Sequence, residues 1–218
     1  MPNDALNHDV ALLLRALSAL LAYPDAELRA GLPDIEAAIR DARRLDARLR
    51  EELLALTGEI AASDPLDAEG RYVDLFDRGR RTSLNLFEHV HGDGRQRGPA
   101  MLDLRQRYLD AGLEPVAGEL PDHLPLMLEY LSCRDAVEMR ETIGEIAHIL
   151  RVLGNALLKH GSRYAAVIAT VLALGGEKGL DARAPVPPEQ DIDADWEERP
   201  AFAPPDLQPA VAPEQPTN

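Results

Sequence analysis

The chain has 218 residues, enough for one domain of ordinary size with an appendage, and 45% of them are apolar, so a hydrophobic core can form. Its formal net charge of −15 argues against a general nucleic-acid binder, because phosphate groups would be repelled, and it suits a basic partner. The only cysteine, Cys133, leaves no partner for an intramolecular disulfide and no set of thiolates for a metal.

The location of the protein is predicted from its cysteine content and its first residues. A single thiol fits a reducing compartment, and the N-terminal residues lack the basic region and cleavage pattern of a signal peptide. Charged residues interrupt every apolar run before it reaches the length of a membrane span. We therefore expect a cytoplasmic protein that does not insert into a membrane, with Cys133 as a small buried side chain.

Apolar residues recur at helical spacing along most of the chain. Asn3 or Asp4 can cap the first helix, and Tyr23-Pro24 ends it. Pro33 is expected at the first position of a helix. The first half of the chain is predicted to form helices at about residues 4–22, 33–43, 45–62 and 67–78, with a short turn capped by Asp25 after the first and Gly79 as the C-terminal cap of the last.

In the second half, Thr82 or Ser83 is predicted to cap a helix that contains Leu86, Phe87 and Val90, and residues 92–98 are predicted to form a loop. Asp122 is expected to cap a helix that continues to Leu131. The remaining helices are predicted at about residues 99–109, 138–159 and 164–174.

No segment alternates apolar and polar residues with the period of two that a strand requires. The predicted fold is therefore all-α, a compact single-domain bundle of about eight to ten helices in residues 1–180. Residues 181–218 hold nine of the 17 prolines and a net charge of −7, and are predicted to be a flexible, largely disordered acidic tail. Within the tail, an island with Trp196 and Phe202 either packs onto the bundle or forms a mobile lid.

Residues 71–98, which we call the central segment, differ from the rest of the chain in composition. They combine an apolar helical start with a cluster of arginines, and contain two of the three phenylalanines and two of the six histidines. A core needs neither this many arginines nor glycines on both sides of an acid. The arginines either pair with acids of neighbouring helices or recognise a carboxylate or another anion. We therefore predict that the central segment is a functional surface.

The histidines of the central segment raise a zinc site as an alternative. His89 and His91 form an H-x-H pair with Glu88 and Asp93 close by, and zinc accepts imidazole and carboxylate ligands. On a helix the two histidine side chains would point about 200° apart, and no remote cluster completes a site. No metal or cofactor is therefore predicted, and a metal-dependent hydrolase centred on His89, His91 and Asp93 stays as the alternative function.

Three stretches of the chain together resemble a known family. The run YVDLFDRGRRTSLNLFEHVHGDGRQRGPAM, from Tyr72, looks like the central motif of the NarJ family of chaperones for nitrate reductase assembly. The run LPDHLPLMLEYLS, from Leu120, resembles the E-x-x-D-H-type motif of the wider group of redox-enzyme maturation chaperones. The opening LLRALSALLAYPDAEL, from Leu13, also fits, so the resemblance covers about residues 6–175.

The resemblance implies an all-α chaperone without catalytic residues. Its partner would be the apo form of the catalytic (alpha) subunit of respiratory nitrate reductase, bound through its N-terminal segment. Binding would allow molybdenum cofactor insertion and delay membrane docking, and the chaperone would not remain in the final enzyme. A maturation chaperone or adaptor for a different molybdoenzyme is the nearest alternative.

The peptide-binding surface is predicted to be an apolar groove that takes an amphipathic helix of the partner. We place it between the helix that carries Tyr72 and the helix that carries Met127. An apolar floor is assigned to Tyr72, Phe76, Leu84, Phe87 and Met127, acidic contacts with basic peptide side chains to Asp74, Asp77, Glu88 and Asp122, and a polar rim to Arg80, Arg81, His89, His91, Arg95 and His123.

Overall fold

The computed structural model describes residues 2–89, 94–115 and 118–184, of which residues 2–7 and 94–97 are described by their backbone alone. Within these ranges the chain forms eight α-helices and two short 3-10 helices, and strand-like pairing is limited to an isolated bridge between Asn85 and His123. The predicted all-α fold is confirmed. The predicted tail, residues 181–218, lies outside the described residues from residue 185 on, including its Trp196 and Phe202 island, and the domain boundary at residue 180 stays a prediction.

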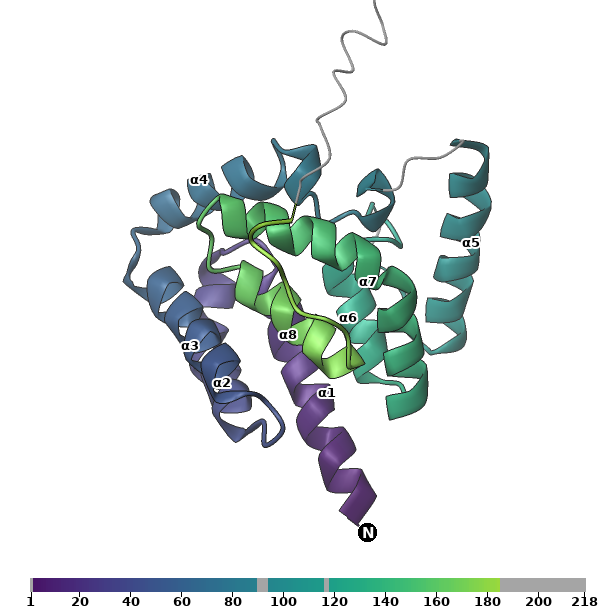
Figure 1. Ribbon diagram of the computed structural model, residues 1–218, viewed down its shortest axis with the longest axis horizontal. Helices are drawn as coiled ribbons and strands as arrows, with labels where there is room; N and C mark the ends of the chain where they lie inside the picture. The colour runs from purple at the N-terminus through teal and green to yellow at the C-terminus, as the bar shows by residue number, and fades with distance from the viewer. Residues whose placement is uncertain (1, 90–93, 116–117, 185–218) are drawn as a thin grey trace, which may run out of the picture. The chain divides into compact units, whose positions relative to one another are not determined.

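The described residues belong to one compact unit. Its elements follow the chain in the order α1 (Pro2–Leu20), α2 (Ala26–Asp41), α3 (Ala47–Ala62), α4 (Pro65–Phe76), η1 (Arg80–Thr82), η2 (Leu86–His89), α5 (Gly94–Asp110), α6 (Leu124–Ser132), α7 (Ala136–Lys159) and α8 (Ala165–Gly175), as Figure 1 shows. None of these described helices is both long enough and apolar enough to cross a membrane.

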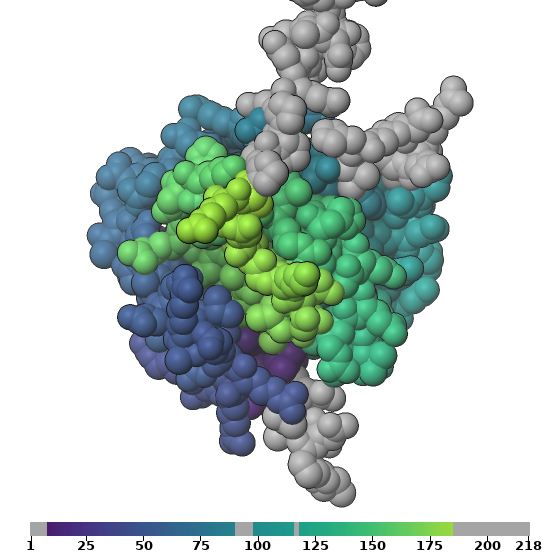
Figure 2. All heavy atoms as spheres, viewed as in Figure 1, coloured from purple at the N-terminus to yellow at the C-terminus, as the bar shows by residue number. Residues whose placement is uncertain are grey.

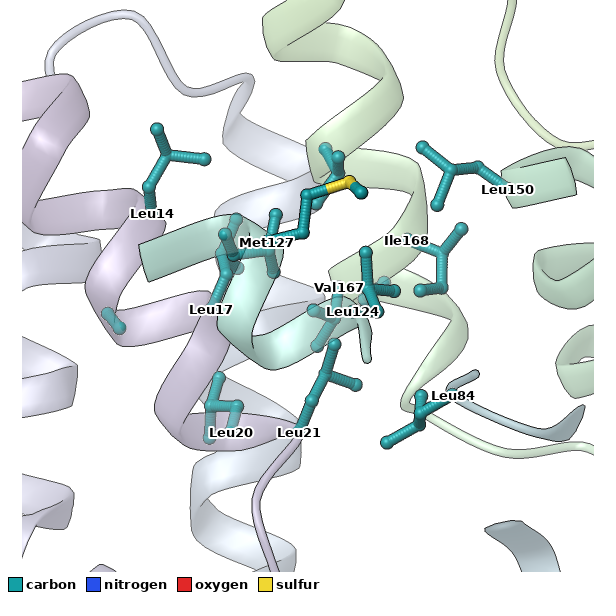
Figure 3. Close-up of a cluster of buried hydrophobic side chains, with 14 of the residues drawn as sticks. Leu14, Leu17, Leu20, Leu21, Leu84, Leu124, Met127, Leu150, Val167 and Ile168 are labelled. Atoms are coloured by element: carbon teal, nitrogen blue, oxygen red, sulfur yellow. The ribbon is translucent and has the colours of Figure 1, made fainter. Parts of the chain in front are cut away.

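Helix α6 lies in the core of the bundle. Eight of its nine residues are buried, and Glu129 is the exposed one. A helix that is apolar on all sides is stable only when other elements cover every face. Helix α1 packs most extensively on α6, and Figure 3 shows Met127 of α6 near Leu17 of α1 and Val167 of α8.

Four helices begin at an aspartate, because a carboxylate can accept the free N–H groups of a first turn. The side chains that do so at α2, α3, α4 and α7 are those of Asp25, Asp46, Asp64 and Asp135. At α7 the N–H groups of Glu138 and Val137 favour the charged carboxylate and hold the pKa of Asp135 below its ordinary value.

Helix α2 corrects the prediction that Pro33 opens a helix. The helix runs through Pro33 without interruption from its cap at Asp25. A proline removes one N–H donor, which usually disfavours the interior of a helix. The helix continues because its buried stripe, with Leu28 and Leu32 before the proline and Ile35 after it, spans Pro33, which lies on the exposed side.

The end of α4 also differs from the prediction. The helix ends at Phe76, and Gly79 has a φ of −117°, not the left-handed conformation of a capping glycine. The hydroxyl of Thr82 instead donates to the carbonyl of Leu75 in the last turn. A Cβ at Gly79 would lie 2.8 Å from Oγ1 of Thr82, so glycine allows a close approach here.

The helix predicted after Thr82 or Ser83 is replaced by the turns η1 and η2. The backbone between them and at the start of η2 pairs with the segment before α6. The N–H of Leu86 donates to the carbonyl of Asp122 at 3.0 Å, and the N–H of Leu124 donates to the carbonyl of Leu84 at 2.9 Å. Backbone groups used across the fold are not available for a continuous α-helix.

Helix α5 begins earlier than predicted. It starts at Gly94, so the predicted loop is wrong for residues 94–98, and Pro99 lies inside the helix. The fixed φ of proline is compatible with a helix, and the loss of one donor is tolerated there. At the other end, Gly112 with a φ of 77° follows the helix as expected.

Cys133 is exposed, so the prediction of a buried cysteine is wrong. It lies directly after α6, at the C-cap position, where the chain leaves the core and turns toward α7. The burial that the apolar pattern of α6 predicts ends with Ser132.

Residues 176–184, which we call the strap, return along α7 after α8 (Figure 1). The N–H of Asp181 donates to Oδ1 of Asn155 at 2.9 Å, and Nζ of Lys159 donates to the carbonyl of Ala184 at 3.1 Å. Leu180 fills the space that Gly154 leaves on α7, where a Cβ would lie 2.4 Å from Cδ2 of Leu180. Glycine at this position therefore lets the strap lie close to the helix.

The contact between Gly154 and Leu180 leads to a stability prediction. Gly154→Ala places a methyl group where Leu180 packs, so the side chain of the strap must move away from α7. We expect the free energy of unfolding to fall by about 1 kcal/mol, although alanine has the better helix propensity. Urea denaturation measures the change.

Gly144 on the same helix provides the control, since the nearest atom to a Cβ there is Oε1 of Glu177, at 3.6 Å. Gly144→Ala should raise the free energy of unfolding by about 0.5–1 kcal/mol. In a Leu180→Ala background, Gly154→Ala should lose most of its destabilising effect, and the contact with Cγ2 of Ile168, 3.0 Å from the added Cβ, would account for the rest. An equal loss with and without Leu180 would show that the strap is not the cause.

Candidate functional site

Four aromatic rings from three parts of the chain meet beside α4. Tyr72 and Phe76 have ring centroids 4.8 Å apart, and Tyr164 packs edge-on against Phe76 at 5.0 Å. Tyr23 packs edge-on against Tyr72 at 5.6 Å. Burial raises the pKa of Tyr164 to about 12 and also raises that of Tyr72, whose hydroxyl donates to the carbonyl of Leu21 at 2.8 Å. These two tyrosines therefore stay protonated and act as packing groups.

A cavity of about 330 Å³ opens beside this cluster, between α3, α4 and the turn that joins α7 to α8. Its apolar lining includes Leu56, Ile60 and Leu75. A second hollow of about 500 Å³ lies along α3 and α8 and shares Glu59 with the first. We call the two together the α4 groove, and volumes of this size are typical of ligand sites. In Figure 2 the blue atoms of α3 and α4 meet the green atoms of the α7–α8 turn.

Two exposed ion pairs lie at the α4 groove. Glu59 of α3 pairs with Arg163 of the α7–α8 turn at 3.0 Å, and Asp74 of α4 pairs with Arg78 at 2.7 Å. Pairs of this kind contribute between about 0 and 1 kcal/mol to stability, because water screens them. A charged side chain of a partner can therefore replace either arginine at little cost.

Asp122 fastens the central segment to the chain before α6. Its side chain is fully buried, and Oδ2 accepts the N–H of Phe87 at 2.9 Å. The prediction that Asp122 caps α6 is wrong, because His123 occupies the N-cap position and its side chain makes no capping bond. The carboxylate instead accepts a hydrogen bond from a residue distant in the sequence, Phe87. It lies beside Tyr108, whose hydroxyl donates to the carbonyl of Pro121 at 2.8 Å.

The described histidines of the predicted site have partners close in sequence. Nε2 of His89 lies 2.8 Å from the carbonyl oxygen of Ser83, and Nδ1 of His123 lies 3.1 Å from Oε1 of Glu119. Among the residues that the structure describes, no three His, Cys, Asp or Glu side chains are placed to hold a metal ion. His91 and Asp93 of the zinc alternative lie outside the described residues.

The predicted site residues divide by their surroundings. Tyr72 and Asp74 line the α4 groove. The fold buries Phe76, Leu84, Asp122 and Met127 and exposes Asp77 and Arg80. The residues that are half-buried in or near the two 3-10 turns are Arg81, Phe87, Glu88, His89 and His123. The described residues do not include His91 or the side chain of Arg95. Because α6 exposes little more than Glu129, the hollow beside α4 is bounded by α3 and the α7–α8 turn.

Sequence reasoning missed the far walls of the α4 groove. Glu59 and Leu56 come from α3, and Tyr164 and His160 come from the α7–α8 turn. Each lies in a segment whose secondary structure was predicted, and Gly161 with a φ of 65° marks the turn. The sequence carries no local sign that these segments lie next to α4.

A family model described as nitrate reductase delta subunit matches residues 25–170. The chain belongs to the nitrate reductase delta subunit family. The match includes α3, α4 and the α7–α8 turn, so the walls of the α4 groove from Leu56 to Tyr164 lie within it.

Relatives in this family carry names that agree with one another. The nitrate reductase molybdenum cofactor assembly chaperone NarJ of Escherichia coli strain K12 is 43% identical over 192 residues, which are 84% of this chain and 80% of that protein. The probable nitrate reductase molybdenum cofactor assembly chaperone NarW of the same strain is 36% identical over 85% of this chain and 81% of its own length. The probable assembly chaperone NarJ of Bacillus subtilis strain 168 is 35% identical over 76% and 89%. The resemblance to the NarJ family predicted from sequence motifs is confirmed.

The structural role of Asp122 is tested by its removal. Asp122→Ala removes the acceptor of the Phe87 N–H, so this donor loses its hydrogen bond, and it leaves a space where the buried carboxylate was. We expect the free energy of unfolding to fall by about 1–3 kcal/mol, the usual cost of breaking a buried hydrogen bond. Urea denaturation followed by circular dichroism measures the loss.

Asp74→Ala is the control, since it removes an exposed carboxylate of the central segment. Its effect should stay within about 0.5 kcal/mol. Similar small losses in both variants would contradict the role given to Asp122.

Proposed function

We propose that this protein is a maturation chaperone of respiratory nitrate reductase, which keeps the apo-enzyme competent for molybdenum cofactor insertion and does not remain in the final enzyme. The observation that carries the proposal is the family match over residues 25–170, together with 43% identity to an assembly chaperone along 84% of the chain. A chaperone acts by binding, so the function asks for a docking surface and no catalytic group.

The partner in this proposal is the catalytic subunit of nitrate reductase, held through its N-terminal segment. The net charge of −15 supports a basic segment, because the field of the protein attracts positive charge over a distance of about 10 Å at ordinary salt. An amphipathic helix is the form in which a short segment presents apolar side chains on one face and basic ones on the other.

The α4 groove is the surface that we propose for this segment. Its apolar lining, with Leu56, Ile60 and Leu75, suits the apolar face of a helix. Glu59 and Asp74 suit basic side chains, because each forms an exposed ion pair that the client can replace.

The proposed surface retains some of the residues predicted from the sequence and adds others. Tyr72 and Asp74 stay in the proposed contact surface. Phe76 supports Tyr72 from the core through its ring contact. The exposed and half-buried residues near η1 and η2, such as Arg80 and Phe87, remain proposed contacts at the end of α4. The cytoplasmic location predicted from the sequence is part of the same proposal, and cell fractionation tests it.

Titration calorimetry with a synthetic peptide of about fifteen residues, some four helical turns, from the start of the cognate catalytic subunit tests the proposal. We expect saturable binding that weakens with salt. Glu59→Lys and Asp74→Lys should each weaken it by about tenfold, because an attractive contact becomes a repulsive one. Leu75→Ala should weaken it through lost apolar contact.

Asp103→Lys is the matched control, with the same change of charge at an exposed position on α5. Figure 1 shows α5 on the opposite side of the view from α3, so this variant should bind normally. No binding by the unaltered protein would contradict the proposed client segment. Unchanged affinity in Glu59→Lys together with a loss in Phe87→Ala would move the site from the α4 groove to η2.

A further inference from the structure

A second groove lies away from the α4 groove. It has a volume of about 620 Å³ and is bounded by α1, the loop between α2 and α3, the turn between α6 and α7, and α8. We call it the α1 groove. None of its lining residues lines the α4 groove. It is therefore a separate surface.

The floor of the α1 groove is apolar. Leu14, Leu131 and Met139 form buried parts of it, and Val10 and Leu174 are partly exposed at its sides. Val137, at the start of α7, is 56% exposed. A partner that covers these side chains removes apolar surface from water, which favours binding.

The rim of the α1 groove carries three arginines, Arg44, Arg134 and Arg140. Within the described part of the chain, none of the three forms an ion pair with a carboxylate. The two acids at the rim, Asp46 and Asp135, accept backbone N–H groups as the caps of α3 and α7. The charges of Arg134 and Arg140 favour the ionised form of Asp135, but no ion pair among the described residues holds any of the three guanidinium groups, so their N–H groups are available to a ligand.

Arg134 is held in place before any ligand binds. Its guanidinium carbon lies 5.1 Å from the centroid of the Tyr130 ring, a cation–π arrangement. Its Nε is buried and donates no hydrogen bond to a described residue. A stacked guanidinium loses little freedom when its remaining N–H groups bind a carboxylate as a fork.

We propose that the α1 groove is a second docking surface and that its occupant is an acidic, amphipathic peptide segment of a partner protein. The segment lays apolar side chains over Leu14 and Met139 and directs carboxylates to Arg134 and Arg140. Charge complementarity selects this occupant, because a basic segment would meet three guanidinium groups. The net charge of −15 repels acidic segments elsewhere, so attraction to this groove is local. The proposal does not depend on the client assigned to the α4 groove.

The test uses the full chain and a labelled helical peptide of about eighteen residues, some five turns, with leucine on one face and glutamate on the other. A second peptide, with lysine in place of every glutamate, is the charge-reversed comparison. Fluorescence anisotropy at about 0.1 M salt should show saturable binding of the glutamate peptide. Amide hydrogen exchange should show protection in α1 and the α6–α7 turn. The lysine peptide can bind the α4 groove, so its binding should be weakened by Glu59→Lys and left unchanged by Arg140→Glu.

Arg140→Glu and Arg134→Glu should each weaken binding of the glutamate peptide by about tenfold. Arg140 is exposed and Arg134 stacks on Tyr130, so Arg140→Glu tests the proposal without disturbing the core. Arg105→Glu on α5 is the control, an exposed arginine with the same change of charge, and should bind normally.

Several outcomes would overturn the proposal. They are no saturable binding of the glutamate peptide, equal loss of binding in Arg105→Glu, and protection confined to α3 and α4. Vesicles of phosphatidylglycerol that bind in an Arg140-dependent way, without binding of the peptide, would assign the groove to a lipid surface instead. Dimerisation abolished by Arg140→Glu would assign it to a second copy of the chain.

Discussion

The burial of α6 is the constraint on which the rest of the structure depends. A nine-residue helix that exposes only Glu129 places six residues in the core cluster, and it needs neighbours on every side. Helix α1 provides the most extensive of these contacts. The chain before α6 is fixed by pairing with residues 84–87 and by the buried carboxylate of Asp122. The central segment is thereby tied to the core instead of forming an independent helix.

This arrangement leaves the surfaces suited to partners at the edges of the bundle. Because α6 is covered, the hollows lie where other helices diverge, at the α7–α8 turn and at the α6–α7 turn. Their charged groups differ in a way that matters for binding. The carboxylates of the α4 groove are held in exchangeable ion pairs, whereas the arginines of the α1 groove have no such partner in the described structure. The two proposed docking surfaces therefore suit segments of opposite charge.

The sequence predicted those features that depend on local chemistry. Helices α1, α3, α7 and α8 were found because apolar spacing and capping signals agree along each of them. Pro33 and Pro99 were misread, since a helix can tolerate the loss of one donor when its buried stripe continues. The bonds of Asp122 to Phe87 and Leu86 join residues far apart in the chain and leave no local pattern. For the same reason Tyr72 and Asp74 were predicted, but Glu59 and Tyr164 across the groove were not.

The exposed position of Cys133 has a practical consequence. It is the only thiol of the chain, and its neighbours Ser132 and Arg134 both line the α1 groove. A maleimide fluorophore can therefore be attached at one defined point without any substitution elsewhere. Since a dye on this side chain sits next to the groove, its emission is sensitive to the local polarity there. The native sequence thus already provides the attachment point for an environment-sensitive dye that reports whether that surface is covered or open to water.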